Sequence, residues 1–274
     1  MISCDAHVHL FGPLARYPVR GPTPYAVPDA TADHLIELMD THGITHAVLV
    51  HAAVSGRDNL LTLDTLRANP TRFRGVLVPP LQEPDDATLL AWHALGVRGM
   101  RFSLTHTAQP GMNLNPHLAA RMADLGWHSQ VHLEGDQIVQ HEAQLLALPG
   151  RVVIDHMARI PASEGLNGAG FTVLRRLLDS GRIWVKLSAP MRLSSRLKPP
   201  YDDVEPLARA LLQQAPDRLV WGSDWPNVNL AHPAPSYGEL MQELLSWTSI
   251  HERQQILWHN PADLYDLPDP EIKD

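Results

Sequence analysis

Cys4-Asp5-Ala6-His7-Val8-His9-Leu10, the first apolar run of the chain, carries two histidines at positions i and i+2. Residues two apart on a strand point to the same face, so both imidazoles are expected to face one point. Two later apolar runs also end in side chains suited to metal or acid–base chemistry: one ends at His156, and the other is followed by Asp224. Polar side chains collected at the C-terminal ends of several parallel strands are typical of a (β/α)₈ barrel.

Strand-like and helix-like patterns alternate along the rest of the chain. Strands are expected at 46–51, 73–78, 97–102, 128–134, 151–155, 183–187 and 218–222, and helices at 33–42, 58–68, 85–95, 116–125, 137–148, 171–179 and 204–214. The strands are continuously apolar, as expected where both faces are buried. The sequence therefore predicts a single domain over residues 1–274, a distorted (β/α)₈ TIM barrel, with a helix at 236–247 and the tail 251–264 covering its outside. An open doubly wound sheet is the alternative, but no Gly-X-Gly-X-X-Gly follows the first strand.

Composition narrows the class of protein. The 274 residues are 44% hydrophobic, which suits one large core, and a net charge of −8 with scattered arginines argues against nucleic acid as a partner. No apolar run approaches the ~20 residues that span a bilayer, and no basic and apolar leader precedes the first strand. Cys4 is the one cysteine, so a buried thiol is expected rather than a disulfide. We therefore expect a soluble cytoplasmic protein, a monomer or homodimer, that acts on a small anion and not at a membrane.

The proline-rich segment 11–29 follows directly on His7 and His9. A loop of this length within a compact domain is usually functional or disordered. We interpret it as a wall of the active site, from which Tyr25 could contact a substrate.

Metal-ligating side chains fall at the ends of four predicted strands. They are His7 and His9 on the first, His132 on the fifth, His156 on the sixth and Asp224 on the eighth. Neutral imidazoles and one carboxylate could hold one divalent ion such as Zn²⁺, with an open position for water. The alternative is that His132 is a packed histidine and that the others polarise the substrate without metal. A second ion lacks a bridging ligand, because the fourth strand ends in Arg101-Phe102.

Positive charge collects at the same predicted rim. Arg101 ends the fourth strand, and Arg159 and Arg192 follow the sixth and seventh. Guanidinium groups bind carboxylates in a bidentate manner, so three of them at one mouth indicate an anionic substrate.

Several motifs together resemble one family. They are Asp5-Ala6-His7-Val8-His9 with the proline-rich loop, Gly56-Arg57-Asp58-Asn59, Gly99-Met100-Arg101-Phe102, Ile154-Asp155-His156-Met157-Ala158-Arg159, Gly222-Ser223-Asp224-Trp225-Pro226 and His259-Asn260-Pro261-Ala262-Asp263-Leu264-Tyr265. The chain resembles the amidohydrolase superfamily nearly end to end, and within it the lactonases of 2-pyrone-4,6-dicarboxylate, sulfomuconolactone and sugar acids. The family fold is a distorted (β/α)₈ barrel.

The resemblance implies roles for these residues. Asp224 would be the general base, and His7, His9 and His156 would polarise the carbonyl or hold metal. The substrate-binding residues would be Arg101, Arg159, Arg192, Tyr25, Ser55 and His132. We expect hydrolysis of a carboxylate-bearing lactone by water that Asp224 activates. The alternatives for Asp224 are a salt bridge to a neighbouring arginine or a purely metal-ligating role. The alternative is a metal-dependent decarboxylase of aromatic acids, although such relatives typically carry glutamate where Asp5 stands.

Three departures from the family pattern bear on metal and substrate. His132 stands where metal-independent pyrone-dicarboxylate lactonases carry tyrosine, which favours bound metal. Asn227 stands where many relatives have histidine, which leaves the particular substrate open. No second arginine or lysine follows Arg101 in Leu104-Thr105-His106-Thr107, which favours a substrate with fewer carboxylates than the pyrone dicarboxylate.

Overall fold

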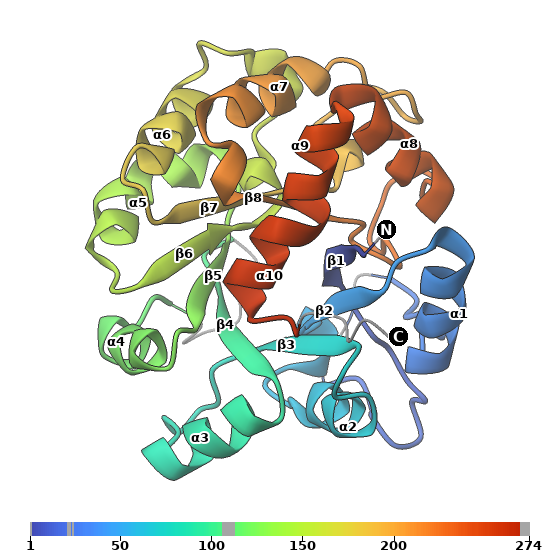
Figure 1. The fold of residues 1–274 in the computed structure, drawn as a ribbon, viewed down its shortest axis with the longest axis vertical. Helices are drawn as coiled ribbons and strands as arrows, with labels where there is room; N and C mark the ends of the chain where they lie inside the picture. The colour runs from blue at the N-terminus through green and yellow to red at the C-terminus, as the bar shows by residue number, and fades with distance from the viewer. Residues whose placement is uncertain (1, 21–22, 24, 106–112, 269–274) are drawn as a thin grey trace, which may run out of the picture.

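The computed structural model describes residues 2–20, 23, 25–105 and 113–268, and its core is one eight-stranded sheet. The strands are β1 (Cys4–Val8), β2 (His46–Val50), β3 (Phe73–Leu77), β4 (Val97–Ser103), β5 (His128–His132), β6 (Arg151–Ile154), β7 (Ile183–Ser188) and β8 (Leu219–Gly222), all parallel and in sequence order. The His9 N–H donates to the Trp225 carbonyl at 2.8 Å, and the Asp224 N–H donates to the His7 carbonyl at 2.9 Å. These bonds join the last strand to the first, so the predicted barrel is confirmed (Figure 1).

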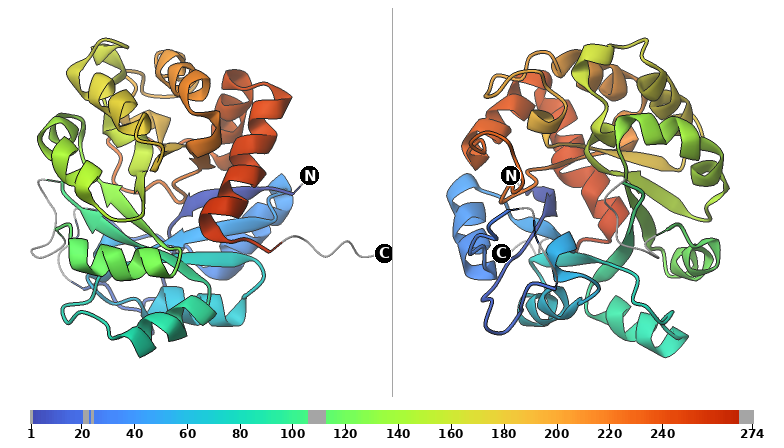
Figure 2. Two further views of the ribbon diagram at one scale, coloured as in Figure 1. Left: turned by 60° about the vertical axis from the view of Figure 1, so that its left-hand side comes forward. Right: turned by 180° about the vertical axis from the view of Figure 1, so that it is seen from behind.

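Helices surround the strands (Figures 1 and 2). They are α1 (Ala32–His42), α2 (Leu60–Ala68), α3 (Asp86–Ala94), α4 (Pro116–Asp124), α5 (Gly135–Ala147), α6 (Ala169–Leu178), α7 (Glu205–Gln214) and α8 (Tyr237–Trp247). The side chains of Thr31, Asp85, Asn115 and Ser236 accept a backbone N–H at the N-termini of α1, α3, α4 and α8. These caps explain why the helices begin where they do.

The C-terminal segment closes one end of the barrel. It contains α9 (Ile250–Gln254), a π-helical turn (Gln255–His259) and α10 (Asn260–Tyr265), which cross in front of the strands in Figure 1. The prediction that the tail covers the outside is wrong, because Leu264 and Tyr265 pack with Cys4, Ala6 and Val48 inside the barrel. The buried Cys4 thiol is as predicted.

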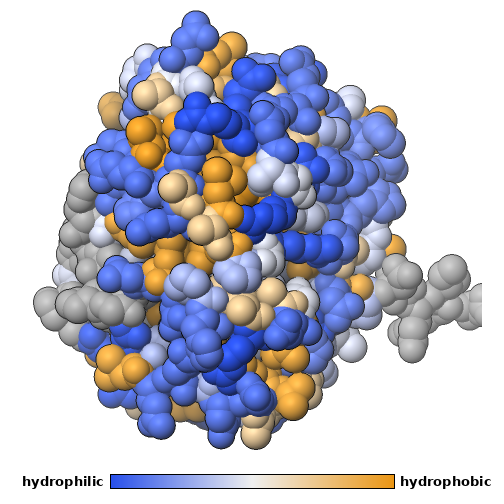
Figure 3. All heavy atoms as spheres, turned by 90° about the vertical axis from the view of Figure 1, so that its left-hand side faces the viewer, coloured by the Kyte–Doolittle hydropathy of each residue, from blue (hydrophilic) through white to orange (hydrophobic). Residues whose placement is uncertain are grey.

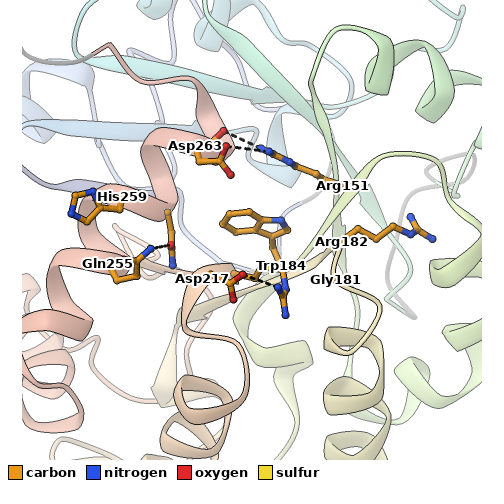
Figure 4. Close-up of a pocket in the computed structure, with 10 residues that line it drawn as sticks. Arg151, Gly181, Arg182, Trp184, Asp217, Gln255, His259 and Asp263 are labelled. Atoms are coloured by element: carbon orange, nitrogen blue, oxygen red, sulfur yellow. Dashed lines mark hydrogen bonds and ion pairs between the residues drawn. The ribbon is translucent and has the colours of Figure 1, made fainter.

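The segment blocks the end where the strands begin. Near the start of β3, Arg74 Nε donates to the Asp266 carbonyl at 3.2 Å, and near the start of β4, Arg98 donates to Asp266 Oδ2 at 2.8 Å. A pocket at this end contains arginines that are already paired (Figure 4), for example Arg151 with Asp263 Oδ1 at 3.1 Å. The active site is therefore expected at the opposite end of the barrel, at the C-terminal ends of the strands.

Four strands end one or two residues earlier than predicted, and for β5 and β6 the cause is local. The prediction for 128–134 is too long, because Glu134 caps α5: its side chain accepts the Gln137 N–H, and the Gln137 side chain accepts the Glu134 N–H. The prediction for 151–155 is also too long, because a tight turn begins at Asp155. Both endings place polar side chains at the same rim of the barrel.

The outer surface is mixed in character. Figure 3 shows one face on which hydrophilic side chains predominate and apolar ones form separate patches. Among the residues that the structure describes, no helix has the length and apolar character needed to cross a membrane.

Candidate active site

Side chains from β1, β6 and β8 meet at the C-terminal end of the barrel. The Nε2 atoms of His7 and His9 lie 3.2 Å apart. Asp224 Oδ1 lies 3.6 Å from His7 Nε2, 3.4 Å from His9 Nε2 and 3.7 Å from the Nε2 of His156. All four residues are buried. The structure therefore brings together three imidazoles and one carboxylate that the sequence singles out.

Unusual backbone conformations aim two of these side chains. His156, Met157, Ala158 and Arg159 have φ between 48° and 58°, and Asp224 has φ of 59°. L-residues rarely adopt this left-handed region, and such residues cluster at functional sites where the surrounding structure holds them. The turn after β6 and the turn after β8 thus direct His156 and Asp224 towards His7 instead of continuing their strands.

Second hydrogen bonds orient two of the imidazoles. His9 Nδ1 lies 2.8 Å from the Val50 carbonyl, which only an N–H can satisfy, and His156 Nδ1 lies 2.7 Å from Ser188 Oγ. The Nε2 atom of His9 is therefore left with a lone pair that faces Asp224. A ring nitrogen held in this way is the usual arrangement of a metal-ligating histidine.

The donor atoms fit one divalent ion. Metal–ligand distances of about 2.0–2.1 Å in a tetrahedral zinc site correspond to ligand separations of about 3.3 Å. Among the described residues, His7, His9 and Asp224 form one group of suitable donors, and His7, Asp155 and His156 form a second. The separations of 3.2, 3.4 and 3.6 Å within the first group are close to that value.

Electrostatics favour neutral imidazoles and an ionised carboxylate. Burial, followed by the charge of Lys186, lowers the pKa of His7 to about 3, and burial also lowers the pKa of His156 well below its usual value. Burial by itself would raise the pKa of Asp224, but His156 and Arg192 outweigh it and hold that pKa well below the usual range. Asp224 can therefore accept a proton at neutral pH.

The buried histidines also predict how stability depends on pH. Burial, followed by nearby positive charge, lowers the pKa of His7, His51 and His128 to about 3, whereas an unfolded histidine titrates near ~6.5. Below pH ~6.5 the unfolded chain binds protons at these histidines and the folded protein does not. The free energy of unfolding is therefore highest above that pH and decreases as the pH falls towards 3. The decrease is at most about 1.4 kcal/mol per histidine per pH unit. Burial raises the pKa of Asp5 to about 6, so the folded protein takes up this proton before the unfolded chain does. Asp5 therefore partly offsets the loss of stability as the pH falls.

Urea unfolding between about pH 7.5 and 4.5 measures this effect. We expect the free energy of unfolding to be nearly constant down to about pH 6.5 and to decrease continuously below it. A constant value would show that these histidines are protonated in the folded protein.

The three predicted arginines lie at this rim, each already paired. Arg101 Nε donates to Asp155 Oδ2 at 2.9 Å, Arg159 to Glu134 Oε1 at 3.2 Å and Arg192 Nε to Asp224 Oδ2 at 3.1 Å. Burial lowers the pKa of Arg159, and the positive charge of Arg192 lowers it further. The turn after β7 brings Arg192 against Asp224, which is the arginine pairing that the sequence left open as an alternative for this carboxylate. The role of Asp224 as general base stays a prediction.

The other predicted substrate-binding residues are less central. Burial raises the pKa of Tyr25, while Arg192 lowers it and Asp224 raises it. A contact between Tyr25 and the substrate stays a prediction. The His132 ring lies 6.0 Å from that of His156 and belongs to neither group of donors among the described residues. Ser55 lies in the turn after β2, where its carbonyl accepts the Asp58 N–H.

Sequence reasoning missed a buried polar network beneath the histidines. Lys186, fully buried on β7, donates to the Ala6 carbonyl and to Gln130 Oε1, both at 2.8 Å, and lies 3.2 Å from His7 Nδ1. Asp155 accepts from Gln130 Nε2 at 3.1 Å in addition to Arg101. The sequence does carry a signal for this network, because Lys186 lies inside the apolar run 183–187. An unpaired buried charge is very costly, so a lysine in such a run indicates that buried polar partners surround it.

A parallel barrel whose strand ends carry three imidazoles and a carboxylate belongs to the class of (β/α)₈ barrel hydrolases. A model of the amidohydrolase family matches residues 4–267. The chain belongs to the amidohydrolase family.

Known proteins with similar sequences and structures span nearly the whole chain. It is 34% identical over 268 residues to the 4-sulfomuconolactone hydrolase of Rhizobium radiobacter, covering 95% of this chain and 89% of that protein. It is 33% identical over 275 residues to the 2-pyrone-4,6-dicarboxylate hydrolase of Comamonas testosteroni, with the same shares covered. A solved structure assigned as a 2-pyrone-4,6-dicarboxylic acid hydrolase, from Acinetobacter baumannii with citric acid bound, has a TM-score of 0.82 and 26% identity over 97% of this chain and 100% of that one.

Proposed function

We propose that this chain hydrolyses a lactone that carries at least one carboxylate. The observation that carries the proposal is the convergence of Asp224 with the imidazoles of His7, His9 and His156. The Arg192 guanidinium pairs with Asp224, and Arg159 lies in the turn that carries His156. Both relatives are hydrolases named for anionic lactones, and the similar solved structure binds citric acid, a tricarboxylic acid. These names support lactone hydrolysis over decarboxylation.

In the proposed reaction Asp224 takes a proton from water as the water oxygen attacks the lactone carbonyl. The ring C–O bond then breaks, and the released oxygen takes up a proton, so that one ester becomes one carboxylate and one hydroxyl group. The imidazoles face the same point and would stabilise the negative charge that develops on the carbonyl oxygen. Arginines at the rim would hold the carboxylate of the substrate.

We also propose that His7, His9, His156 and Asp224 can hold one divalent ion, with Zn²⁺ the best match to imidazole and carboxylate ligands. Such an ion supplies a Lewis acid for the carbonyl and lowers the pKa of water.

The decarboxylase alternative finds little support in the position of Asp5. Its carboxylate accepts the N–H groups of His7 at 3.1 Å and Ser223 at 3.0 Å, and the Tyr237 hydroxyl at 2.9 Å. These bonds join β1 to β8 and occupy the carboxylate. We therefore assign Asp5 a structural role.

A panel of lactones tests the proposed function. We expect acid release from lactones that bear one or two carboxylates and little from neutral lactones of the same ring size. The segment that contains His106 and Thr107 lies outside the described residues, so mono- and dicarboxylates both belong in the panel. Metal content, measured on the same preparation, shows whether an ion accompanies activity. Equal rates on neutral and anionic lactones would contradict the proposal.

The variant Arg159→Met tests whether Arg159 binds the carboxylate of the substrate. The Arg159 side chain is 29% exposed and has one carboxylate partner, Glu134, so it can turn to a substrate more easily than Arg101 or Arg192. Loss of hydrogen bonds to a charged group costs about 1.5–3 kcal/mol, so KM for anionic lactones should rise ~10–100-fold with little change in thermal stability. Arg176→Met, which breaks an exposed pair with Glu142 on the outer helices, should leave KM unchanged. An unchanged KM in Arg159→Met would remove this residue from the site.

A further inference from the structure

The barrel closes directly at residues of the candidate site. Neighbouring strands from β1 to β8 are joined by parallel ladders, but within the part of the chain that the structure describes β1 and β8 share only an isolated bridge between Val8 and Trp225. The two strands are nevertheless very close, because a Cβ on Gly222 would lie 2.5 Å from His7 Cβ. We call this junction the seam. His7 and Asp224 stand on its two sides, so its geometry sets how they face each other.

The carboxylate of Asp5 bridges the seam. Asp5 is fully buried, and its Oδ1 accepts the N–H of His7 at 3.1 Å and the N–H of Ser223 at 3.0 Å. His7 lies on β1, whereas Ser223 follows β8 and directly precedes Asp224. A hydrogen bond confines its donor and acceptor to a narrow range of distances, so one oxygen that accepts from both sides fixes their spacing. The position of the Asp5 side chain therefore determines how His7 and Asp224 are presented.

A hydroxyl from an outer helix holds that carboxylate in place. Tyr237, the first residue of α8, donates to Asp5 Oδ2 at 2.9 Å across 232 positions of sequence. The Tyr237 ring is buried, and its centroid lies 5.9 Å from that of Trp221 and 4.9 Å from that of His42. Because the ring is packed on both of these neighbours, the hydroxyl stays directed at Asp5. A residue of α8 thus takes part in closing the barrel at the candidate site.

We propose that Tyr237 is a positioning residue: through Asp5, its hydroxyl fixes the seam and so holds His7 and the Asp224 carboxylate at the separation that the reaction needs. A misplacement of about 1 Å in a reacting group can lower a rate ~10²-fold, so a bond this far from the chemistry can still affect turnover. Arg101 lies on β4 and Arg159 in the turn after β6, so binding of a substrate carboxylate does not depend on the seam. The effect on turnover rests on the proposed function, whereas the effect on the seam does not.

Amide hydrogen exchange, followed by mass spectrometry, tests the effect on the seam without any substrate. Tyr237→Phe removes one hydroxyl and keeps the packed ring. We expect the peptides that contain residues 4–8 and 219–224 to exchange ~5–10-fold faster than in the wild type, which is the loss of about one hydrogen bond, with the rest of the barrel unchanged. Tyr201→Phe is the matched control, because the Tyr201 hydroxyl is also buried but has no hydrogen-bond partner among the described residues. No change at the seam in Tyr237→Phe, or an equal increase throughout the barrel, would overturn the proposal.

Steady-state kinetics with the best lactone of the panel test the effect on the reaction. In Tyr237→Phe, kcat should fall about 10-fold, the lower end of the loss that follows removal of an outer partner of a site residue, while KM changes less than about 2-fold. A contact with only a structural role would lower Tm and leave the kcat of the folded protein unchanged. Tyr201→Phe should keep the kcat of the wild type. An unchanged kcat in Tyr237→Phe would show that the seam does not set the reaction geometry, contrary to the proposal.

Asp5→Asn is a second variant, one that keeps the hydrogen bonds. Its amide oxygen can still accept from His7 and Ser223, and its amide nitrogen can donate to the Tyr237 hydroxyl oxygen. We expect exchange at the seam to stay close to that of the wild type. Faster exchange there than in Tyr237→Phe would show that the charge of Asp5, and not the bond from Tyr237, holds the strands, which contradicts the proposal. If the wild type hydrolysed no lactone of the panel, the proposed function would fail, and the exchange comparison would still decide the role of Tyr237 at the seam.

Discussion

Asp224→Asn is expected to lower kcat for a carboxylate-bearing lactone by ~10²–10⁴-fold, the usual worth of a general base. Water is a poor nucleophile at neutral pH, so a group in the site must accept its proton. Asp224 is ionised, since burial is outweighed by His156 and Arg192, which hold its pKa well below the usual range. Asparagine preserves the size of the side chain and can still accept from Arg192, but it cannot take a proton.

Steady-state kinetics with the best lactone of the panel measure this effect, and thermal unfolding checks that the fold survives. Asp263→Asn is a suitable control because Asp263 pairs with Arg151 at the other end of the barrel. Its kcat should equal that of the wild type. Near-normal turnover in Asp224→Asn would transfer the role of base to His156, whose lowered pKa leaves its imidazole neutral.

Asp155→Ala should be the most destabilising of the substitutions considered, by ~3–5 kcal/mol of unfolding free energy. The carboxylate is fully buried; it accepts from Arg101 Nε at 2.9 Å and lies 3.7 Å from the Lys186 ammonium. Removing it leaves two buried cations without their shared counter-ion. Truncating one partner of a buried ion pair costs far more than the pair itself contributes, because the remaining charge has lost its solvation.

Urea unfolding at neutral pH measures the change, with Asp202→Ala as the control. Asp202 pairs with Arg196 at 2.8 Å on the surface, where both side chains are about half exposed, so its loss should cost at most ~1 kcal/mol. If the two variants were equally stable, the network beneath the histidines would contribute no more than a surface ion pair.

Local patterns in the sequence were sufficient for the barrel and for part of the site. Continuous apolar runs separated by helical patterns predict buried parallel strands, since each run must bury both faces. The two-residue period of a strand places His7 and His9 on one face, and the position of Asp224 after an apolar run places it at the same rim. These features depend on neighbours in the chain, so the sequence alone is enough to determine them.

The partners of these residues depend on closure of the barrel. Lys186 meets His7 across 179 positions of sequence, and Arg192 meets Asp224 only because two turns bend towards each other. The C-terminal tail likewise fills the barrel because an apolar interior was open at that end, which no local pattern in the tail reveals. The side-chain periodicity of a strand predicts which way a residue points. It does not predict which charged group lies opposite, because the partner depends on the register between strands that are far apart in the sequence. The sequence by itself therefore determined the barrel and its histidines, and the tertiary structure decided which polar groups surround each histidine and which charge Asp224 faces.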